Sequence, residues 1–204
     1  LLDLPLIKYA ASTLKPIIIS TGMSSDLEIS EAVETVLSVG NKNLILLHCI
    51  SSYPTPPENY NLRRIEYLKK RFGVISGLSD HTMGTTTAIA SIPLGSSVIE
   101  KHFTISRLDK GPDSEFSSEP SEFYKLCSES KQAWSSLGNQ TFNRDVSEVK
   151  NKDLRRSIYF IKDKKAGELI SESDIKRIRP GRGIHPKYFS KIIGSKLKVD
   201  VERG

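Results

Sequence analysis

Two histidines near the middle of the chain have the type and the spacing that metal or acid–base chemistry needs. His81 lies in the motif Gly77-Leu-Ser-Asp-His-Thr82, and His102 lies in Glu100-Lys-His-Phe-Thr104. A short apolar run precedes each motif, so each histidine is expected at the end of a strand. Neutral imidazole is the commonest protein ligand for a divalent ion. The pair is therefore a candidate metal site.

The segment between the two motifs predicts how they are joined. Residues 85–94 are rich in Ala and Ile and lack Gly, and their first proline is Pro93, so we expect a short helix. A strand, a helix and a second strand in such a short stretch form a unit whose strands are parallel. Parallel neighbours end on the same side of a sheet, so both histidines are expected at one mouth.

Carboxylates beside the histidines favour a metal site. Two histidines alone would fit equally well as loop residues that only form hydrogen bonds. Asp80, Glu100 and Asp113 fit a hard or borderline ion such as Mn²⁺ or Mg²⁺ and can orient a sugar hydroxyl. The alternative for Glu100 is a surface ion pair with Lys101. Strand alternation argues against that pair, because it places neighbouring side chains on opposite faces.

Further candidates lie at the ends of other strands. Small hydroxyl donors there, with the backbone of the Thr21-Gly22 loop, could hold a phosphate or carboxylate, although a loop serine is more often a turn residue: Ser20, Ser51, Ser52 and Ser79. Tyr53 precedes prolines that fix its direction, which suits either a pocket wall or a packed loop. Arg179, in a glycine loop, is a solvated arginine unless its module folds over the site.

The surrounding elements predict a βα repeat. Apolar runs separated by helical patterns end at Ser20, His48, Ser79 and Glu100. Four βα units make the C-terminal half of a (β/α)8 TIM barrel. Residues 1–14 are expected to be the end of a helix that begins before the chain. Residues expected to face inward from the helices at 26–39 and 120–137 include Leu27, Leu37, Cys127, Trp134 and Leu137.

A polar segment divides the chain. Residues 139–154 lack an apolar pattern and predict a linker between residues 1–138, the barrel portion, and residues 155–204, a small β-rich module. In the module, residues 171–174 resemble a helix start.

Composition restricts the function classes. The 204 residues carry a net charge of +6, spread along the chain rather than clustered between aromatics, which argues against nucleic acid and suits small anionic substrates. Two isolated cysteines indicate reduced thiols, and no apolar run is long enough to cross a bilayer. We expect a soluble, cytoplasmic protein.

Six motifs together resemble, in order and spacing, the bacterial sialic acid synthase family. They are the two histidine motifs, Ser20-Thr-Gly-Met23, His48-Cys49 with Ser52-Tyr-Pro-Thr-Pro56, Gly111-Pro-Asp113 and Arg179-Pro-Gly181. The resemblance implies a TIM barrel with an antifreeze-like (SAF) domain. It also implies a transferase that condenses phosphoenolpyruvate with an amino sugar to a nine-carbon acid and releases phosphate.

Within the family the loops resemble the pseudaminic acid synthases, which implies a 2,4-diacetamido-6-deoxy hexose as substrate. N-acetylneuraminate and legionaminate synthases are the alternatives. Outside the family, a sugar-binding module would not need two histidines and a carboxylate, and a metal-dependent aldolase would not need the appended glycine-arginine loop.

The resemblance also implies a role for each candidate. It makes the histidines ligands of a divalent metal, with Mn²⁺ expected and Mg²⁺ or Co²⁺ as alternatives, and makes Glu100 the group that manages protons. Among the substrate contacts, Ser20 and Ser79 would bind phosphoenolpyruvate, and Glu100, Tyr53 and Asp113 would bind the sugar. Arg179 would be a contact that the SAF domain supplies. Ser51 occupies a substrate-loop position where N-acetylneuraminate synthases often carry Asn.

The resemblance has a consequence for completeness. Family members have four further strands and a lysine that grips phosphoenolpyruvate, and they form a homodimer in which the SAF domain reaches the partner's barrel. The chain is therefore expected to be the C-terminal portion of such an enzyme and to be inactive alone.

Overall fold

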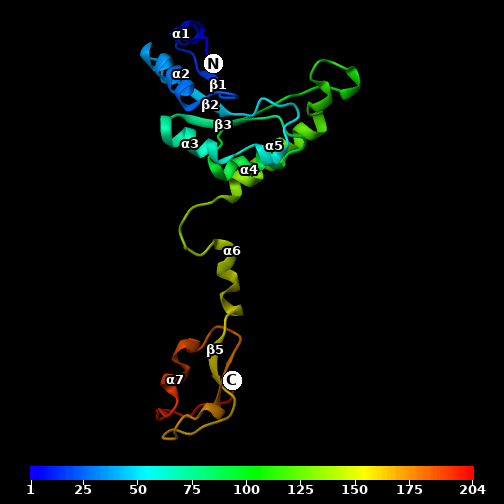
Figure 1. Ribbon diagram of the computed structural model, residues 1–204. Helices are drawn as coiled ribbons and strands as arrows, with labels where there is room; N and C mark the ends of the chain where they lie inside the picture. Colours follow the sequence, from blue (N-terminus) through cyan, green and yellow to red (C-terminus); the bar gives the residue numbers. More distant parts are fainter. The chain divides into compact units, whose positions relative to one another are not determined.

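The computed structural model describes residues 1–204, which divide into two compact units, Leu1–Asn139 and Gln140–Gly204 (Figure 1). Each unit has a hydrophobic core of its own. None of the helices combines the length and the apolar character that a membrane span would require.

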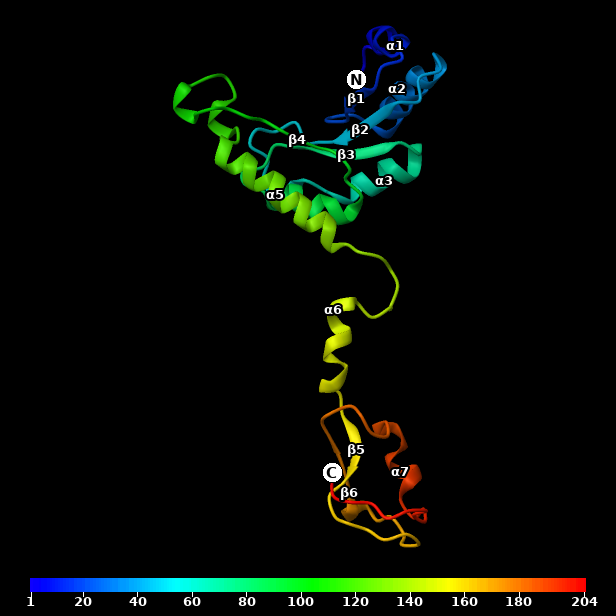
Figure 2. The ribbon, with the colours of Figure 1, turned by 180° about the vertical axis from the view of Figure 1, so that it is seen from behind.

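The first unit is a βα repeat around one four-stranded sheet. The strands are β1 (Ile17–Ser20), β2 (Leu44–His48), β3 (Ile75–Asp80) and β4 (Ile99–Lys101), in the order β1-β2-β3-β4 with every neighbouring pair parallel. The helices are α1 (Leu4–Ser12), α2 (Asp26–Ser38), α3 (Arg63–Phe72), α4 (Thr86–Ser91) and α5 (Pro120–Ser136). Figure 2 shows the strands side by side, with α3 and α5 on one side of them. The predicted half barrel is confirmed.

The two faces of the sheet differ in what covers them. Leu44 and Leu46 of β2 pack with residues of α1, α2 and α3, and Leu78 of β3 packs with residues of α3, α4 and α5. Because side chains alternate along a strand, the intervening residues face the opposite side. Gly77 is one of them: a Cβ there would lie 2.3 Å from the Val98 carbonyl oxygen, so only glycine fits. This second face is the interior face of the barrel wall.

Local sequence explains where the helices begin and end. Ser25 caps α2, and Glu28 bonds back to the Ser25 N–H to complete a capping box. Gly73 ends α3 with a left-handed φ of 65°. The expectation for residues 1–14 was wrong, because α1 has its own start: the Asp3 carboxylate accepts the Leu6 N–H, which caps the helix.

Five residues expected to face inward are exposed instead. They are Leu27, Leu37, Cys127, Trp134 and Leu137. In α2 the buried face is formed by residues such as Ile29 and Val33, and in α5 Leu126 alone is buried. Helix α5 follows the last of only four strands, so one side of it has no sheet to cover.

The second unit is small and rich in turns. Strands β5 (Ser157–Phe160) and β6 (Ile175–Ile178) are antiparallel, and α6 (Val146–Val149) and α7 (Phe189–Ile192) are short helices. The core contains Ile158, Ile170 and Ile175. The predicted helix start at residues 171–174 is a three-residue 3₁₀ turn, Glu172–Asp174, which leads directly into β6. Residues 150–154 of the expected linker also form a 3₁₀ turn.

Candidate active site

The two histidines meet at the carboxyl ends of neighbouring strands. Asp80 and Lys101 are register partners and are the last residues of β3 and β4, so His81 and His102 occupy equivalent positions just beyond the sheet. Their ring centroids are 5.4 Å apart and the ring planes are inclined at 69°. The placement that the sequence predicts is therefore observed.

The tautomer of His81 is set by a backbone carbonyl. Nδ1 lies 2.8 Å from the Ile50 oxygen, and because a carbonyl only accepts, Nδ1 carries the proton. In the neutral ring this leaves the Nε2 lone pair free to bind a metal ion or to accept a proton. A carbonyl that holds the other ring nitrogen is a common support for a metal-binding histidine. His81 is also buried, which restricts other ring orientations.

Ser79 links His81 to Glu100. The Ser79 Oγ lies 2.7 Å from Glu100 Oε1 and 3.2 Å from His81 Nε2. Its hydroxyl has one proton, so it can donate to only one of these two groups at a time. A protonated His81 could donate to Ser79 while Ser79 donates to Glu100. The three side chains therefore form one short hydrogen-bonded path, which can pass a proton only while His81 Nε2 holds no metal ion.

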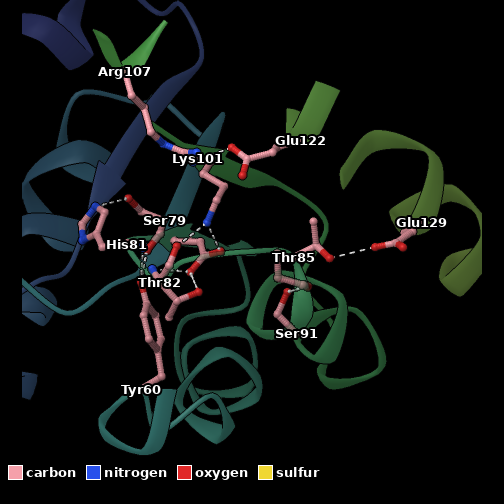
Figure 3. Close-up of polar contacts among 12 residues, drawn as sticks. Tyr60, Ser79, His81, Thr82, Thr85, Ser91, Lys101, Arg107, Glu122 and Glu129 are labelled. Atoms are coloured by element: carbon pink, nitrogen blue, oxygen red, sulfur yellow. Dashed lines mark hydrogen bonds and ion pairs between the residues drawn. The ribbon is translucent and has the colours of Figure 1, made fainter. Parts of the chain in front are cut away.

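Tyr60, which sequence reasoning missed, holds the backbone of this path (Figure 3). Its hydroxyl donates to the Ser79 carbonyl over 2.5 Å and accepts the His81 N–H over 2.9 Å. Burial raises the pKa of the Tyr60 phenol, so it stays protonated and keeps donating. A tyrosine between prolines and a helix gives no sequence signal for this role, because the bonds join positions 19 and 21 residues apart.

An aromatic wall stands against the histidine pair. The Tyr53 ring lies 4.3 Å from His81 and 5.7 Å from His102, centroid to centroid, and Phe116 lies 5.1 Å from His102. The Tyr53–Pro54 peptide is cis, and the Thr55 N–H donates to the His81 carbonyl. The loop after β2 is thus fixed to the end of β3, and Tyr53 is half exposed beside the site.

The loop after β4 supplies Asp113. Its Oδ2 lies 3.7 Å from His102 Nδ1. The loop returns to β4, where the Ser118 N–H donates to the His102 carbonyl, and Arg107 ties it to Glu122 at the start of α5 (Figure 3). Asp113 is largely exposed, so its carboxylate is available to a ligand.

The expectation that Asp80 belongs to the site was wrong. Its carboxylate lies on the helix-covered face of the sheet, fully buried, and pairs with Lys101. Glu100 and Lys101 lie on opposite faces of β4, as the alternation of side chains predicts: Glu100 contacts Ser79 on the interior face, and Lys101 points the other way.

The remaining predicted residues lie at more distant positions. Ser20 ends β1, two strands away from β3, and is exposed. Ser51 packs against the loop after β1, where a Cβ on Gly22 would lie 2.5 Å from the Ser51 Oγ. The carbonyl of Ser52 accepts a hydrogen bond from the Thr55 hydroxyl. Arg179 belongs to the second unit, exposed just beyond β6 and before a cis proline.

Two protein-family models match the chain. The NeuB family model matches residues 1–142, and the SAF domain model matches residues 155–204. The chain belongs to the NeuB family. The NeuB and SAF matches cover the half barrel and the small β-rich unit, and thus confirm the resemblance on which the expectations for both were based.

Two curated relatives and one solved structure illustrate the family. A pseudaminic acid synthase of Campylobacter jejuni is 38% identical over 198 residues, and an N,N'-diacetyllegionaminic acid synthase of the same species is 38% identical over 195 residues. They match 97% and 94% of this chain, and the chain spans 58% of the length of each. A crystal structure of an N-acetylneuraminic acid synthetase from Leptospira borgpetersenii, with citrate, is 34% identical with a TM-score of 0.68, covering 73% of this chain and 52% of that one.

Proposed function

We propose that the full-length protein condenses phosphoenolpyruvate with a 2-acetamido hexose and releases phosphate, giving a nine-carbon nonulosonic acid. The observation that carries the proposal is the meeting of Glu100, Ser79 and His81 beside His102, at the carboxyl end of parallel strands. Active sites of TIM barrels lie at this end. The names of the relatives support the product class, because all three synthesise acids of this kind by name.

The reaction moves two protons, one to the aldehyde oxygen and one to the leaving phosphate, and the added water supplies both. C3 of phosphoenolpyruvate attacks the aldehyde carbon of the open-chain sugar, a C–C bond forms, and the aldehyde oxygen takes a proton. Water then adds at C2 and loses one proton, which leaves a hydroxyl on C2. The C2–O bond to phosphate breaks as this hydroxyl gives its proton to the leaving phosphate and becomes the C2 carbonyl. Glu100 is the group that we assign to these transfers, and Ser79, whose Oγ lies 2.7 Å from Glu100 Oε1, orients its carboxylate. His81 would take no part in them, because its Nε2 would be bound to the divalent ion.

The donor set fits a divalent ion with two ligands from this chain. His81 presents a free Nε2, and the His102 ring lies 5.4 Å away, centroid to centroid. No set of three His, Cys, Asp or Glu side chains converges on such a point, so water, substrate or other groups would complete the shell. When bound, the ion, which we propose to be Mn²⁺ with Mg²⁺ or Co²⁺ as alternatives, would polarise the sugar aldehyde.

Substrate contacts are proposed for the other candidates. Ser20 and Ser79 would offer hydroxyls to the anionic phosphoenolpyruvate, and Ser51, which lies against the loop after β1, would contact the substrate from that loop. Tyr53 provides a wall, and Asp113 provides a carboxylate for sugar hydroxyls. We also propose that Arg179 reaches the barrel of a partner subunit in a swapped homodimer. The protein would be cytoplasmic, and residues 1–204 would be inactive without the rest of the barrel.

For the sugar we propose a 2,4-diacetamido-6-deoxy hexose, as in pseudaminic acid synthesis. Identity to the pseudaminic and the legionaminic enzyme is 38% in each case, so the proposal rests on the loop motifs. A site that hydrogen-bonds an acetamido group rejects sugars that lack it more strongly than an apolar wall rejects an extra hydroxyl.

The test is a comparison of kcat/KM on the full-length protein for the diacetamido precursors of pseudaminic and legionaminic acid and for N-acetylmannosamine. We expect the pseudaminic precursor to be preferred. A higher kcat/KM for either of the other two sugars would reassign the substrate while keeping the reaction.

A further inference from the structure

A buried ion pair lies directly behind the histidines, on the face of the sheet that does not carry the site. Lys101 Nζ is 2.7 Å from Asp80 Oδ2, and the two side chains are 4% and 0% exposed. Nζ also donates to the Thr82 carbonyl over 2.7 Å. The other Asp80 oxygen accepts both the N–H and the hydroxyl of Thr82, at 2.9 and 2.8 Å. Figure 3 shows the Lys101 amino group directed toward Thr82.

Stability alone does not account for such a pair. Removing two charges from water carries a large desolvation penalty, and a pair of apolar residues of similar size often stabilises a protein as well or better. An apolar pair here would leave the N–H, hydroxyl and carbonyl of the buried Thr82 without their partners, so what the charged pair adds is its hold on the residue that follows His81. Buried ion pairs are best attested as devices that fix register.

The position of this pair is suited to that purpose. Asp80 immediately precedes His81, and Lys101 immediately precedes His102. Asp80 and Lys101 are register partners across β3 and β4. Thr82, on the far side of His81, is held by both members of the pair. The backbone on both sides of His81 is therefore tied to the residue before His102.

We infer that Asp80 and Lys101 are positioning residues that set the separation and direction of the two imidazoles for a shared ligand. They act through the backbone, because their side chains lie on the opposite face from the rings. The inference rests on the proposed function in one respect only: the shared ligand is taken to be the divalent ion.

The test compares Co²⁺ binding in the full-length protein and in the double variant Asp80→Asn with Lys101→Met. Asparagine keeps an oxygen for the Thr82 N–H and hydroxyl, and methionine keeps an unbranched side chain without the charge. We expect a cooperative thermal transition to remain and the Co²⁺ dissociation constant to rise about 10- to 100-fold, as for other groups that orient metal ligands. The visible absorption of bound Co²⁺ should also change, since the spectrum follows ligand geometry.

Lys164→Met is the matched control. Lys164 is a mostly buried lysine that pairs with Asp174 at 3.3 Å in the second unit, so its loss should leave the Co²⁺ affinity unchanged. If the double variant does not fold, Thr82→Val removes one bond to Asp80 and keeps the N–H, and a smaller rise in the dissociation constant is expected.

The outcomes separate the two proposals. Absence of Co²⁺ binding by the unmodified protein would remove the metal from the proposed function and overturn this inference with it. Normal Co²⁺ affinity and an unchanged spectrum in the double variant, or in Thr82→Val where the double variant does not fold, would overturn the inference alone.

Discussion

Replacing Tyr60 by phenylalanine removes one oxygen from the centre of the site and leaves the ring in place. Tyr60 is 1% exposed, and its hydroxyl joins the Ser79 carbonyl to the His81 N–H. Both groups belong to the end of β3, and neither can turn toward water without moving the strand. The substitution therefore breaks two buried hydrogen bonds and removes only one oxygen atom from the packed core.

The expected cost follows from those two bonds. A buried hydrogen bond contributes about 1 kcal/mol net, and a buried group left without a partner costs about 1–3 kcal/mol. We expect Tyr60→Phe to lower the free energy of unfolding by about 2–3 kcal/mol, measured by urea denaturation of the full-length protein. It should also lower kcat, because the Ser79–His81 segment then has more freedom to move Ser79 away from Glu100 and to misplace the His81 ring.

Tyr67→Phe is the matched control, because it makes the same chemical change at a site that is 48% exposed. The Tyr67 hydroxyl donates one bond, to Asp26 over 2.7 Å, so its loss should cost less than about 1 kcal/mol. Equal losses of stability in the two variants, with kcat unchanged in Tyr60→Phe, would refute the role assigned to Tyr60.

Three further predictions concern other parts of the chain. His81→Ala and His102→Ala should each abolish Co²⁺ binding by the full-length protein in a titration, whereas His185→Ala, in the second unit, should not; retention of metal in the first two would contradict the ligand assignment. Gly77→Ala should destabilise the protein by about 1–3 kcal/mol in urea denaturation, because the new Cβ would lie 2.3 Å from a backbone oxygen; a neutral effect would contradict that packing. Hydrogen bonds from the Ser171 hydroxyl and N–H hold the pKa of Asp174 well below 3.8, so the stability that the ionised carboxylate contributes is present above that pH and is lost as the pH falls further. Asp174→Asn should therefore lower the thermal midpoint at pH 7, and the difference from the unmodified protein should shrink in acid. A difference that does not depend on pH would be evidence against this account.

The sequence predicted the βα repeat and the site at its strand ends because both depend on local patterns. Continuous apolar runs mark strands buried on both faces, and the motifs that follow β3 and β4 lie where parallel strands must end together. The alternation of side chains was enough to separate Glu100 from Lys101. These inferences require only the period of a strand and the direction of its neighbour.

The errors arose where distant contacts decide. Asp80 was expected in the site because it is next to His81. Its ion pair with Lys101 depends on the pairing of β3 with β4, which the sequence around Asp80 does not show. The contribution of Tyr60 depends on how the loop after β2 folds over β3, which no local pattern encodes. Trp134 was expected to be buried because its helix is amphipathic, but burial also requires a strand for that face to cover.

The most direct test of the central claim is phosphate release by the full-length protein from phosphoenolpyruvate labelled with ¹⁸O at the bridging position. The account predicts that release requires both the amino sugar and a divalent ion, that one nine-carbon acid forms for each phosphate, and that the label leaves in the phosphate, since the C2–O bond breaks. Label retained in the organic product would contradict the mechanism, and phosphate release that is independent of any amino sugar would contradict the assignment of the protein as a nonulosonic acid synthase.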